Sequence, residues 1–537
     1  MSRHASHHVC AVAALLLSLT PVSDRAAAQD GATRYEECRI IDVRRPGEPP
    51  WRERSCIHRI VPDLDDPPAP RPRNALEPPA CNEDFYLDAL VSSAVTERLL
   101  ELKKRHIYIS SQREIAAIRR EMTEDYHAYM QEALQTLSRD VTTMALVYGR
   151  KSGATCAWLV GARGILAEAP IAPWQDSLSA TLRDGLGVSA VQLRKAPSQR
   201  VRAGACVPAA QPAPAAQAAP DRPPQAQALA AAGERLLPPQ IAQVLIKASD
   251  PAKPPRLLIV TIADLRAIPF AALPLGQDSL IDRFTIGMLP SIDQLVALAR
   301  PARAPADLPR PAARRAPPKA AKSGAGARPG LKALLVGDPD LSRNTDFCWP
   351  PIPATRDEIK AAAAKWGTGS PALVGAQANF SRVTQLLRSN SASLEVIYFA
   401  THGITSAENP ADASFLALAG KNLRGADLRK VQLDNTPIVI MSACQTGLGK
   451  TFAFGTFGLA EAWHYAGARQ IVMSLWNVDD AGTLALMKSF IGHYDRRGAG
   501  AEFALAKAMR ALKASNPDPA IWASFVAFGS PGAAGGP

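Results

Sequence analysis

Short apolar runs alternate with amphipathic stretches along the part of the chain that follows residue 150. Most of these runs lack an apolar–polar alternation, which is typical of strands buried on both faces of a parallel sheet. The runs are Cys156–Val160, Leu257–Ile262, Ala333–Gly337, Val396–Ala400, Ile438–Ala443, Ile471–Trp476 and Trp522–Phe528. Strands that alternate with helices predict a doubly wound α/β domain.

Helix-start signals lie between these apolar runs. Thr355 and Glu358 have the spacing of a capping box just before Ile359, in which each side chain bonds the other residue's backbone. Asp479 or Asp480 precedes a second apolar stripe at helical spacing. Both stretches are therefore predicted to be helices of the α/β domain.

A helical region is expected before this domain, over residues 84–140. Ser111 and Glu114 form another possible capping box, and apolar residues then recur in steps of three and four from Ile115 to Val141. Such a stripe belongs either to a packed helical core or to a partner-binding helix. No 34-residue self-similarity is present, so the sequence does not support a tetratricopeptide array.

The first residues have the pattern of a secretory signal. An apolar run from Val9 to Leu19 follows Arg3 and is too short to span a membrane, and Ala26–Ala28 resembles a signal-peptidase site. We therefore expect a signal peptide over residues 1–28, a secreted or periplasmic mature protein, and no stable membrane insertion after cleavage. The alternative is an apolar N-terminal helix of a cytosolic protein.

The net charge of +12 suggests nucleic-acid binding until its position is considered. The segment from Arg300 to Arg328 holds eight basic residues against one acid, Asp307, and it contains no aromatic residue that could stack on a base. Its Pro/Ala-rich composition favours a solvated connector over a nucleic-acid-binding arm. Residues 196–232 have the same composition, so the α/β domain is expected over residues 141–537 with linkers at 196–232 and 300–328.

Cysteine number bears on the compartment and on disulfide bonding. The chain has 8 cysteines, and loss of Cys10 with the leader would leave an odd number, hence at least one free thiol. Residues 29–83 are rich in Pro, Arg and Asp, and we expect an extended, cysteine-containing segment there. Cys38 with Cys56 is a guess for one disulfide pair, based on proximity alone.

Two of the predicted strands end in residues with catalytic chemistry. His402 and Gly403 follow one strand and Cys444 follows another, and catalytic groups in open parallel sheets gather at the carboxyl ends of strands. An adjacent imidazole raises the thiolate fraction of a cysteine, and the N–H groups of Gly403 and Cys444 could bind an oxyanion. Taken singly, such a His is usually a structural residue and such a Cys a small hydrophobe; together they indicate a cysteine peptidase.

The sequence gives weaker support for other kinds of functional site. Gly449-Lys450-Thr451 looks like the end of a phosphate-binding loop, but Cys444 stands where that motif needs glycine. Neither C-x-x-C nor H-E-x-x-H occurs. We therefore predict no nucleotide hydrolysis, no metal and no cofactor.

From about Val141 to Gly529 the chain resembles the CHAT family, bacterial caspase-like cysteine peptidases related to caspases, separases and gingipains. The similarity rests on Leu257-Leu258-Ile259-Val260, Ile268-Pro269-Phe270-Ala271-Ala272-Leu273, Phe399-Ala400-Thr401-His402-Gly403, Met441-Ser442-Ala443-Cys444-Gln445-Thr446-Gly447, Ala466-Gly467-Ala468, Ser474-Leu475-Trp476-Asn477-Val478-Asp479-Asp480 and Trp522-Ala523-Ser524-Phe525-Val526. The chain departs from the family in lacking its common tetratricopeptide repeats and in having an apparent secretion signal.

The resemblance implies a caspase-like α/β/α sandwich that hydrolyses a protein or peptide substrate through a thioester. His402 would be the general base and Cys444 the nucleophile. In separases and gingipains an acidic residue in the substrate pocket selects a basic residue, and the resemblance points to Asp479 and Asp480 for that role. Both residues could instead simply cap the following helix. A catalytically silent interaction or regulatory module of the same shape is the alternative to an enzyme.

Overall fold

The computed structural model describes a defined set of residues, which form two compact units of the chain. The first unit comprises residues 1–77 and 108–114, and the second comprises residues 78–107 and 115–537. The described residues are 32–43, 51–62, 81, 115–118, 120, 142–151, 154–172, 181–182, 184–186, 225–261, 265, 267–289, 332–344, 346, 349, 352–367, 372–404, 413–444, 455–476, 480–495 and 500–530. The expected signal peptide, most of the helical region at 84–140 and the linker at 300–328 lie outside them.

The first unit contains two long strands where the sequence indicated only an extended segment. β1 (Ala32–Val43) and β2 (Trp51–Pro62) pair antiparallel, with Cys38 directly opposite Cys56 in the backbone register. Neither strand has the strict apolar–polar alternation that signals a strand in a sequence. The Cys38–Cys56 disulfide stays a prediction.

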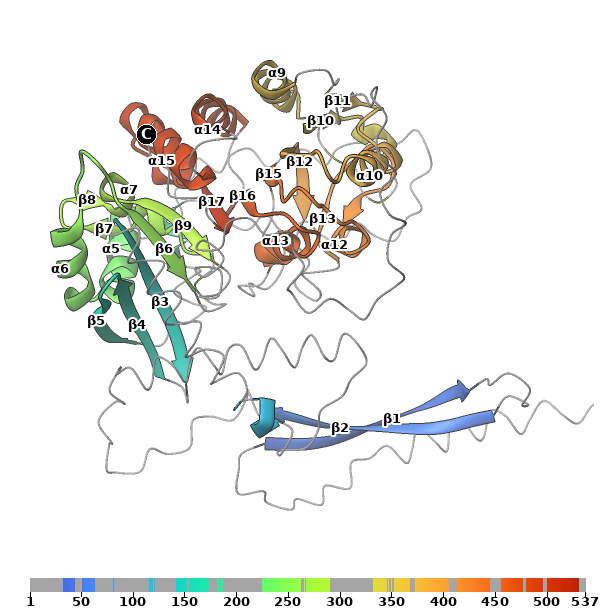
Figure 1. Cartoon of the computed structure of the whole chain (residues 1–537), viewed down its shortest axis with the longest axis horizontal. Coiled ribbons are helices and arrows are strands. Elements are labelled where there is room, and N and C mark those ends of the chain that lie inside the picture. The colour runs from blue at the N-terminus through green and yellow to red at the C-terminus, as the bar shows by residue number, and fades with distance from the viewer. Residues whose placement is uncertain are drawn as a thin grey trace, which may run out of the picture. The chain divides into compact units, whose positions relative to one another are not determined.

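The second unit is built on one large sheet (Figure 1). In spatial order its main path runs through β11 (Leu373–Gly375), β10 (Ala333–Pro339), β12 (Val396–Ile404), β15 (Ile438–Cys444), β16 (Gln470–Ser474), β17 (Phe525–Gly529), β9 (Thr285–Leu289), β6 (Arg256–Val260), β3 (Thr143–Lys151), β4 (Ala154–Gly161) and β5 (Gly164–Ile171). Two short strands, β13 (Phe415–Leu416) and β14 (Leu423–Arg424), extend from β12. A separate small hairpin joins β7 (Pro274–Leu275) and β8 (Asp278–Ser279).

Two parallel blocks make up this sheet and run in opposite directions. The strands from β11 to β16 are parallel to one another, as are those from β17 to β3. The blocks meet at the antiparallel pair β16 and β17, and β4 and β5 add an antiparallel edge. The expectation of a mostly parallel sheet is confirmed. The run at Cys156–Val160, however, lies in β4, which is antiparallel to both of its neighbours, and the strand in the run Trp522–Phe528 is antiparallel to β16 and parallel to β9.

Helices cover both faces of the sheet around β12. Tyr398 and Phe399 are neighbours in this strand, so their side chains point to opposite faces. Tyr398 contacts Trp366 of α9 (Ala354–Trp366), whereas Phe399 contacts Trp463 of α13 (Gly455–Tyr465). The predicted α/β/α sandwich is therefore confirmed.

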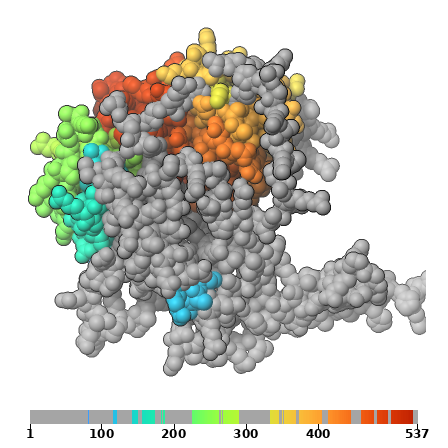
Figure 2. Space-filling view, viewed as in Figure 1, coloured from blue at the N-terminus to red at the C-terminus, as the bar shows by residue number. Residues whose placement is uncertain are grey.

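The remaining helices pack around this framework. They are α5 (Gln225–Leu236), α6 (Pro239–Ala248), α7 (Leu280–Arg283), α10 (Phe380–Ser389), α12 (Gly425–Leu428), α14 (Asp480–His493), α15 (Ala501–Ser515) and α16 (Pro519–Trp522), with 3₁₀ turns at Phe270–Ala272 and Leu341–Arg343. α14 packs on α9 and α15, and in Figure 2 the yellow α9 segment adjoins the red C-terminal helices.

Two boundary predictions are wrong. The linker expected to reach Ala232 ends earlier, because α5 begins at Gln225. The segment from Gln225 to Leu237 has no proline, and alanine is the best helix former, so an Ala-rich composition alone did not mark a connector. The predicted capping box fails as well: α9 already begins at Ala354, so Thr355 lies inside the helix, where its hydroxyl donates to the Ile352 carbonyl (2.7 Å).

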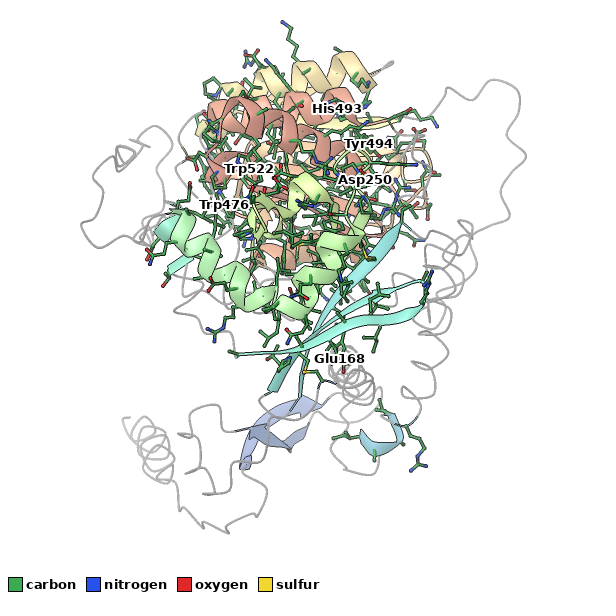
Figure 3. All side chains as sticks on the ribbon, turned by 90° about the vertical axis from the view of Figure 1, so that its left-hand side faces the viewer. Glu168, Asp250, Trp476, His493, Tyr494 and Trp522 are labelled. Carbon is green, nitrogen blue, oxygen red and sulfur yellow. A yellow bond between two sulfur atoms is a disulfide. The ribbon has the colours of Figure 1, made fainter. Side chains whose placement is uncertain are left out.

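The last predicted strand divides into a helix and a strand. Asp518 caps α16 by accepting a hydrogen bond from the Ala520 N–H (2.9 Å), and Pro519 occupies the first helical position. β17 then begins at Phe525. Trp476, labelled with Trp522 in Figure 3, donates its indole N–H to the Ala520 carbonyl (2.8 Å), so this short helix packs against the segment after β16.

Candidate active site

His402 and Cys444 occupy equivalent positions on neighbouring strands. β12 and β15 are parallel and adjacent, and His402 is the backbone partner of Cys444 at the carboxyl ends of both strands. Partnered residues of parallel strands lie on the same face of a sheet. The structure thus brings together the two residues that the sequence picked out. The possible phosphate-binding segment at Gly449-Lys450-Thr451 lies outside the described residues.

His402 is buried and held by both its ring and its backbone. Only 7% of the residue is exposed, and its imidazole stacks on the indole of Trp349 with 4.9 Å between ring centroids. The Ala417 N–H donates to the His402 carbonyl (2.8 Å). The preceding residue, Thr401, donates its hydroxyl to the Ala417 carbonyl (2.7 Å).

Gly403 lies in a narrow space beside the end of β15. A Cβ atom at this position would come within 3.2 Å of the Ala443 Cβ, which is tighter than ordinary packing. Successive amides along a strand point to opposite sides. Because the His402 carbonyl faces Ala417 of the segment after β13, the Gly403 N–H points toward β15 and Cys444.

A buried carboxyl group lies beneath the His402–Cys444 pair. Tyr398, Ala400 and His402 share one face of β12, and the Tyr398 hydroxyl donates to the Glu358 carboxyl from α9. Glu358 is 1% exposed. Ser442, the backbone partner of Ala400, is buried on the same face, and its hydroxyl has no hydrogen bond of good geometry.

Burial determines the pH at which the Glu358 carboxyl loses its proton. It raises the pKa of Glu358 to about 7; the Tyr398 and Ser442 hydroxyls oppose the rise, and the Asp480 carboxylate adds to it. Burial also raises the pKa of Tyr398 well above its usual value. A carboxyl that changes charge near neutral pH therefore lies on the His402 face of β12, in contact with a side chain four residues before His402.

Asp480 lies at the same edge of the sheet as the pair. It is the exposed first residue of α14, just after β16, which is the neighbour of β15. The Ser474 hydroxyl at the end of β16 donates to the Ala443 carbonyl (3.0 Å), which joins the two strand ends. Asp479 lies outside the described residues. Asp480 also begins a helix, so both roles considered for it fit its position.

Sequence reasoning missed Trp349, Tyr398 and Ser442, and assigned Glu358 to a cap. Tyr398 lies four residues before His402 and Ser442 lies two residues before Cys444, so strand periodicity alone could have placed them on the same face. Nothing in the sequence signalled the Trp349 stack. Among the described residues, no cluster of His, Cys, Asp or Glu could hold a metal ion, and no helix is long and apolar enough to cross a membrane.

Comparisons with known proteins extend this picture. Tetratricopeptide repeat protein 28 of Mus musculus is 26% identical over 318 residues, and the human protein of that name is 25% identical over 319. The match covers 51% of this chain but only 12% of either relative.

Two solved structures are also similar to this chain, at low identity. The separase–securin complex of Saccharomyces cerevisiae matches 84% of this chain and 34% of its own, with 10% identity and a TM-score of 0.46. The RgpB pro- and mature domains of Porphyromonas gingivalis match 55% of this chain and 69% of their own, with 13% identity and a TM-score of 0.33.

The CHAT domain family model matches residues 226–530. The match begins later than Val141, where the resemblance was expected to start, although β3, β4 and β5 belong to the same sheet. It contains both His402 and Cys444. Because it covers more than half of the chain, this protein belongs to the CHAT domain family.

Proposed function

We propose that this chain is a cysteine endopeptidase in which His402 is the general base and Cys444 the nucleophile. The observation that carries the proposal is the backbone register of His402 with Cys444 at the ends of adjacent strands. A base must be within hydrogen-bonding reach of the proton that it takes, and this register allows that approach. The caspase-like fold of the family supports the same reading.

Peptide hydrolysis would proceed in two stages. His402 takes the Cys444 thiol proton, and the thiolate attacks the scissile carbonyl carbon. The N–H groups of Gly403 and Cys444 stabilise the resulting oxyanion. The intermediate collapses to a thioester as the imidazolium gives its proton to the leaving amine. Water, deprotonated by His402, then hydrolyses the thioester and frees the thiol.

We also propose that the protein acts in a secreted or periplasmic compartment. A disulfide joins Cys81 to Cys156, and such bonds persist mainly in oxidising compartments. The leader-like residues 1–28 support the same proposal. The stripe from Ile115 to Val141 remains a candidate for binding a partner protein, and no nucleic-acid partner is proposed.

Covalent labelling tests the catalytic proposal. Purified protein is incubated with a library of peptide acyloxymethyl ketones, and the modified residue is identified by mass spectrometry. We expect labelling at Cys444, none in Cys444→Ala, and a loss of several orders of magnitude in peptide hydrolysis for His402→Ala, because the two residues act as one unit. Cys206→Ala, which removes a different thiol, should be labelled like the wild type.

A catalytically silent module is the second candidate, since a fold does not prove activity. That candidate predicts no Cys444 labelling with any member of the library. Hydrolysis that survives in Cys444→Ala would end the peptidase proposal and leave any activity to other residues.

A further inference from the structure

The indole ring of Trp349 lies flat on the imidazole of His402. The ring planes make an angle of 15°, and Trp349 is only 8% exposed. The contact joins the segment between β10 and α9 to the end of β12. One face of the His402 ring is therefore covered by a large, rigid side chain.

A small apolar cluster holds Trp349 in place. Its indole packs edge-to-face on Phe415 of β13, with 6.3 Å between ring centroids, and Leu341 and Ile352 belong to the same cluster. β13 pairs with β12 immediately after His402. The stack and its support are thus built on the strand that carries His402.

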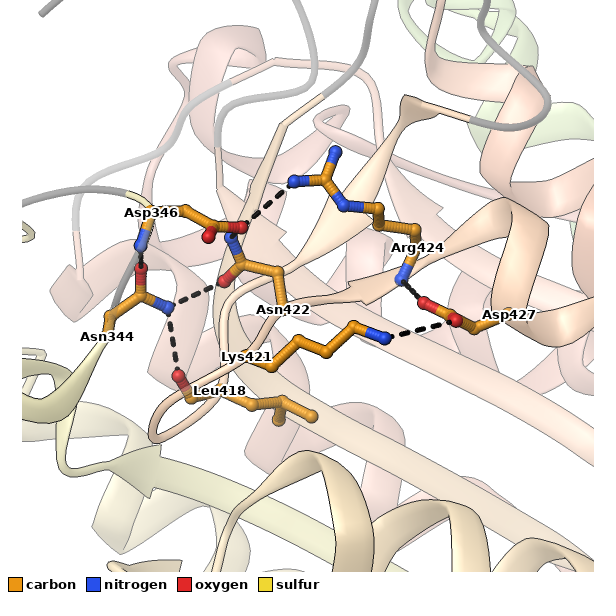
Figure 4. A network of polar contacts seen from close by, with 7 residues as sticks. All are labelled: Asn344, Asp346, Leu418, Lys421, Asn422, Arg424 and Asp427. Carbon is orange, nitrogen blue, oxygen red and sulfur yellow. Dashed lines mark hydrogen bonds and ion pairs between the residues drawn. The ribbon is translucent and has the colours of Figure 1, made fainter. Parts of the chain in front are cut away.

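A polar network fixes the segment that leads to Trp349 (Figure 4). The Asn344 amide donates to the Leu418 carbonyl (2.9 Å) and to the Asn422 side chain (2.6 Å). The Asp346 carboxylate accepts from Asn422 (2.8 Å) and from Arg424 (2.9 Å). The Asp346 N–H donates to the Asn344 side chain (3.1 Å). This segment is therefore tied to the turn that joins β13 and β14.

Backbone contacts alone do not orient the His402 ring. The bonds of its carbonyl and of Thr401 to Ala417 fix the main chain, whereas the orientation of the ring is set by what the ring itself contacts. A flat stack restricts that rotation to the plane of the indole. Misplacement of a catalytic group by about 1 Å can cost on the order of a hundredfold in rate.

We propose that Trp349 is a positioning residue that holds the His402 imidazole in the orientation needed to take the Cys444 thiol proton, with the Asp346 network holding Trp349. The inference rests on the peptidase function proposed above. In the step concerned, the S–H bond breaks, its proton forms an N–H bond on the imidazole, and the thiolate keeps the electron pair. Trp349 itself exchanges no proton.

The rate at which iodoacetamide alkylates Cys444 tests the proposal, because this small reagent reports thiolate formation without a bound peptide. The Cys444 peptide is quantified by mass spectrometry at successive times. Trp349→Met keeps an apolar side chain without a flat ring, and we expect alkylation slowed about tenfold, toward the rate of His402→Ala. Trp349→Phe keeps a flat ring and should react at close to the wild-type rate, faster than Asp346→Ala.

Two further variants make the result decisive. Trp158→Phe removes another buried indole, from β4, and should leave the rate unchanged. Asp346→Ala loosens the network without touching the apolar cluster and should slow alkylation about threefold, which tests the proposal even where Trp349→Met does not fold.

The contradicting outcomes are separable. The positioning role alone would be overturned if His402→Ala slows alkylation but Trp349→Met reacts at the wild-type rate. Where Trp349→Met does not fold, a wild-type alkylation rate in Asp346→Ala has the same meaning. A wild-type rate in His402→Ala would overturn the peptidase proposal, and the positioning role with it. Equal slowing of Trp349→Phe and Trp349→Met would show that only the indole's bulk matters and would also overturn the positioning role.

Discussion

Asp480 is the residue at which substrate preference can be tested. Its exposed carboxylate lies at the sheet edge that holds His402 and Cys444. A charge-assisted pair with a buried arginine is worth roughly 1.5–3 kcal/mol per hydrogen bond. If the carboxylate lines the pocket, Asp480→Asn should lower kcat/KM about ten- to a hundredfold for peptides with Arg before the scissile bond, and leave Leu peptides unchanged.

Kinetics on peptides that differ only at that position decide the role of Asp480. Asp495→Asn, which changes a carboxylate beyond the far end of α14, is the matched control and should keep the Arg preference. Wild-type protein that cleaves Arg and Leu peptides equally, or prefers Asp, would leave Asp480 with only its role at the start of the helix.

Glu358 should make stability depend on pH. Burial raises its pKa from 4.5 to about 7 in the folded protein, so the folded state holds this proton more tightly than the unfolded chain does. Its favourable contribution is complete below pH 4.5 and is lost as pH rises toward 7. The loss amounts to roughly 3 kcal/mol in the free energy of unfolding.

Urea unfolding at pH 4.5 and pH 7.5 measures this dependence. Glu358→Gln keeps an acceptor for Tyr398 but cannot ionise, so its free energy of unfolding should gain roughly 3 kcal/mol relative to wild type between the two values. Asp357→Asn, at the exposed neighbouring position of α9, should follow the wild type. Parallel pH curves for wild type and Glu358→Gln would show that Glu358 does not titrate in this range.

Glu358 also shows which properties of a single residue could not be predicted from the sequence. Its spacing from Thr355 matched a capping box, but α9 already begins at Ala354, so Thr355 lies inside the helix and the Glu358 carboxyl accepts from the buried Tyr398 hydroxyl. His402 and Cys444 could be chosen because both follow apolar runs, and strand ends are common catalytic positions. Trp349 could not be predicted from the sequence, since its stacking contact with His402 depends on the path of a loop, which no periodic pattern encodes.

At the scale of elements, strands were easier to predict than their order. Nonalternating apolar runs marked β6, β10, β12, β15 and β16, because these strands are buried on both faces. The reversal between β16 and β17 was not predicted. Apolar composition is the same whichever way a buried strand runs, so direction depends on how the connections pack.

A buried charge cluster connects elements of the two parallel blocks. Arg256 at the start of β6 lies 3.4 Å from Glu502 of α15, and Gln470 at the start of β16 donates to the same carboxylate (2.7 Å). Both charged side chains are buried. Glu502→Gln leaves the Arg256 charge without its counter-charge, and we expect a loss of about 3–5 kcal/mol in the free energy of unfolding.

A double variant distinguishes pairing from simple packing. Arg256→Met combined with Glu502→Gln removes both charges, so it should recover at least half of that loss in urea unfolding. A double variant as unstable as the sum of both single changes would mean that the two side chains contribute independently, and that the cluster does not act as a pair.

At the scale of the whole molecule, the disulfide shows most clearly what the sequence left open. After loss of the leader and with Cys444 reduced, six cysteines allow fifteen pairings, and sequence spacing does not choose among them. Only the path of the chain brings Cys81 to Cys156 on β4, where the Trp158 indole N–H also donates to the Cys81 carbonyl (3.1 Å). The bond closes a loop of 75 residues.

Opening that loop should destabilise the second unit. By the chain-entropy argument, a cross-link of this span restricts the unfolded state by roughly 4 kcal/mol, and removal of native disulfides costs about 2–5 kcal/mol. We expect Cys81→Ser with Cys156→Ser to lower the urea midpoint accordingly.

Thiol counting on the denatured mature protein should find at most five free thiols, or three if Cys38 and Cys56 also pair. Seven free thiols would contradict both the disulfide and the proposed export. If five or three free thiols are found but the double variant unfolds at the wild-type urea midpoint, only the stabilising role of the disulfide is contradicted.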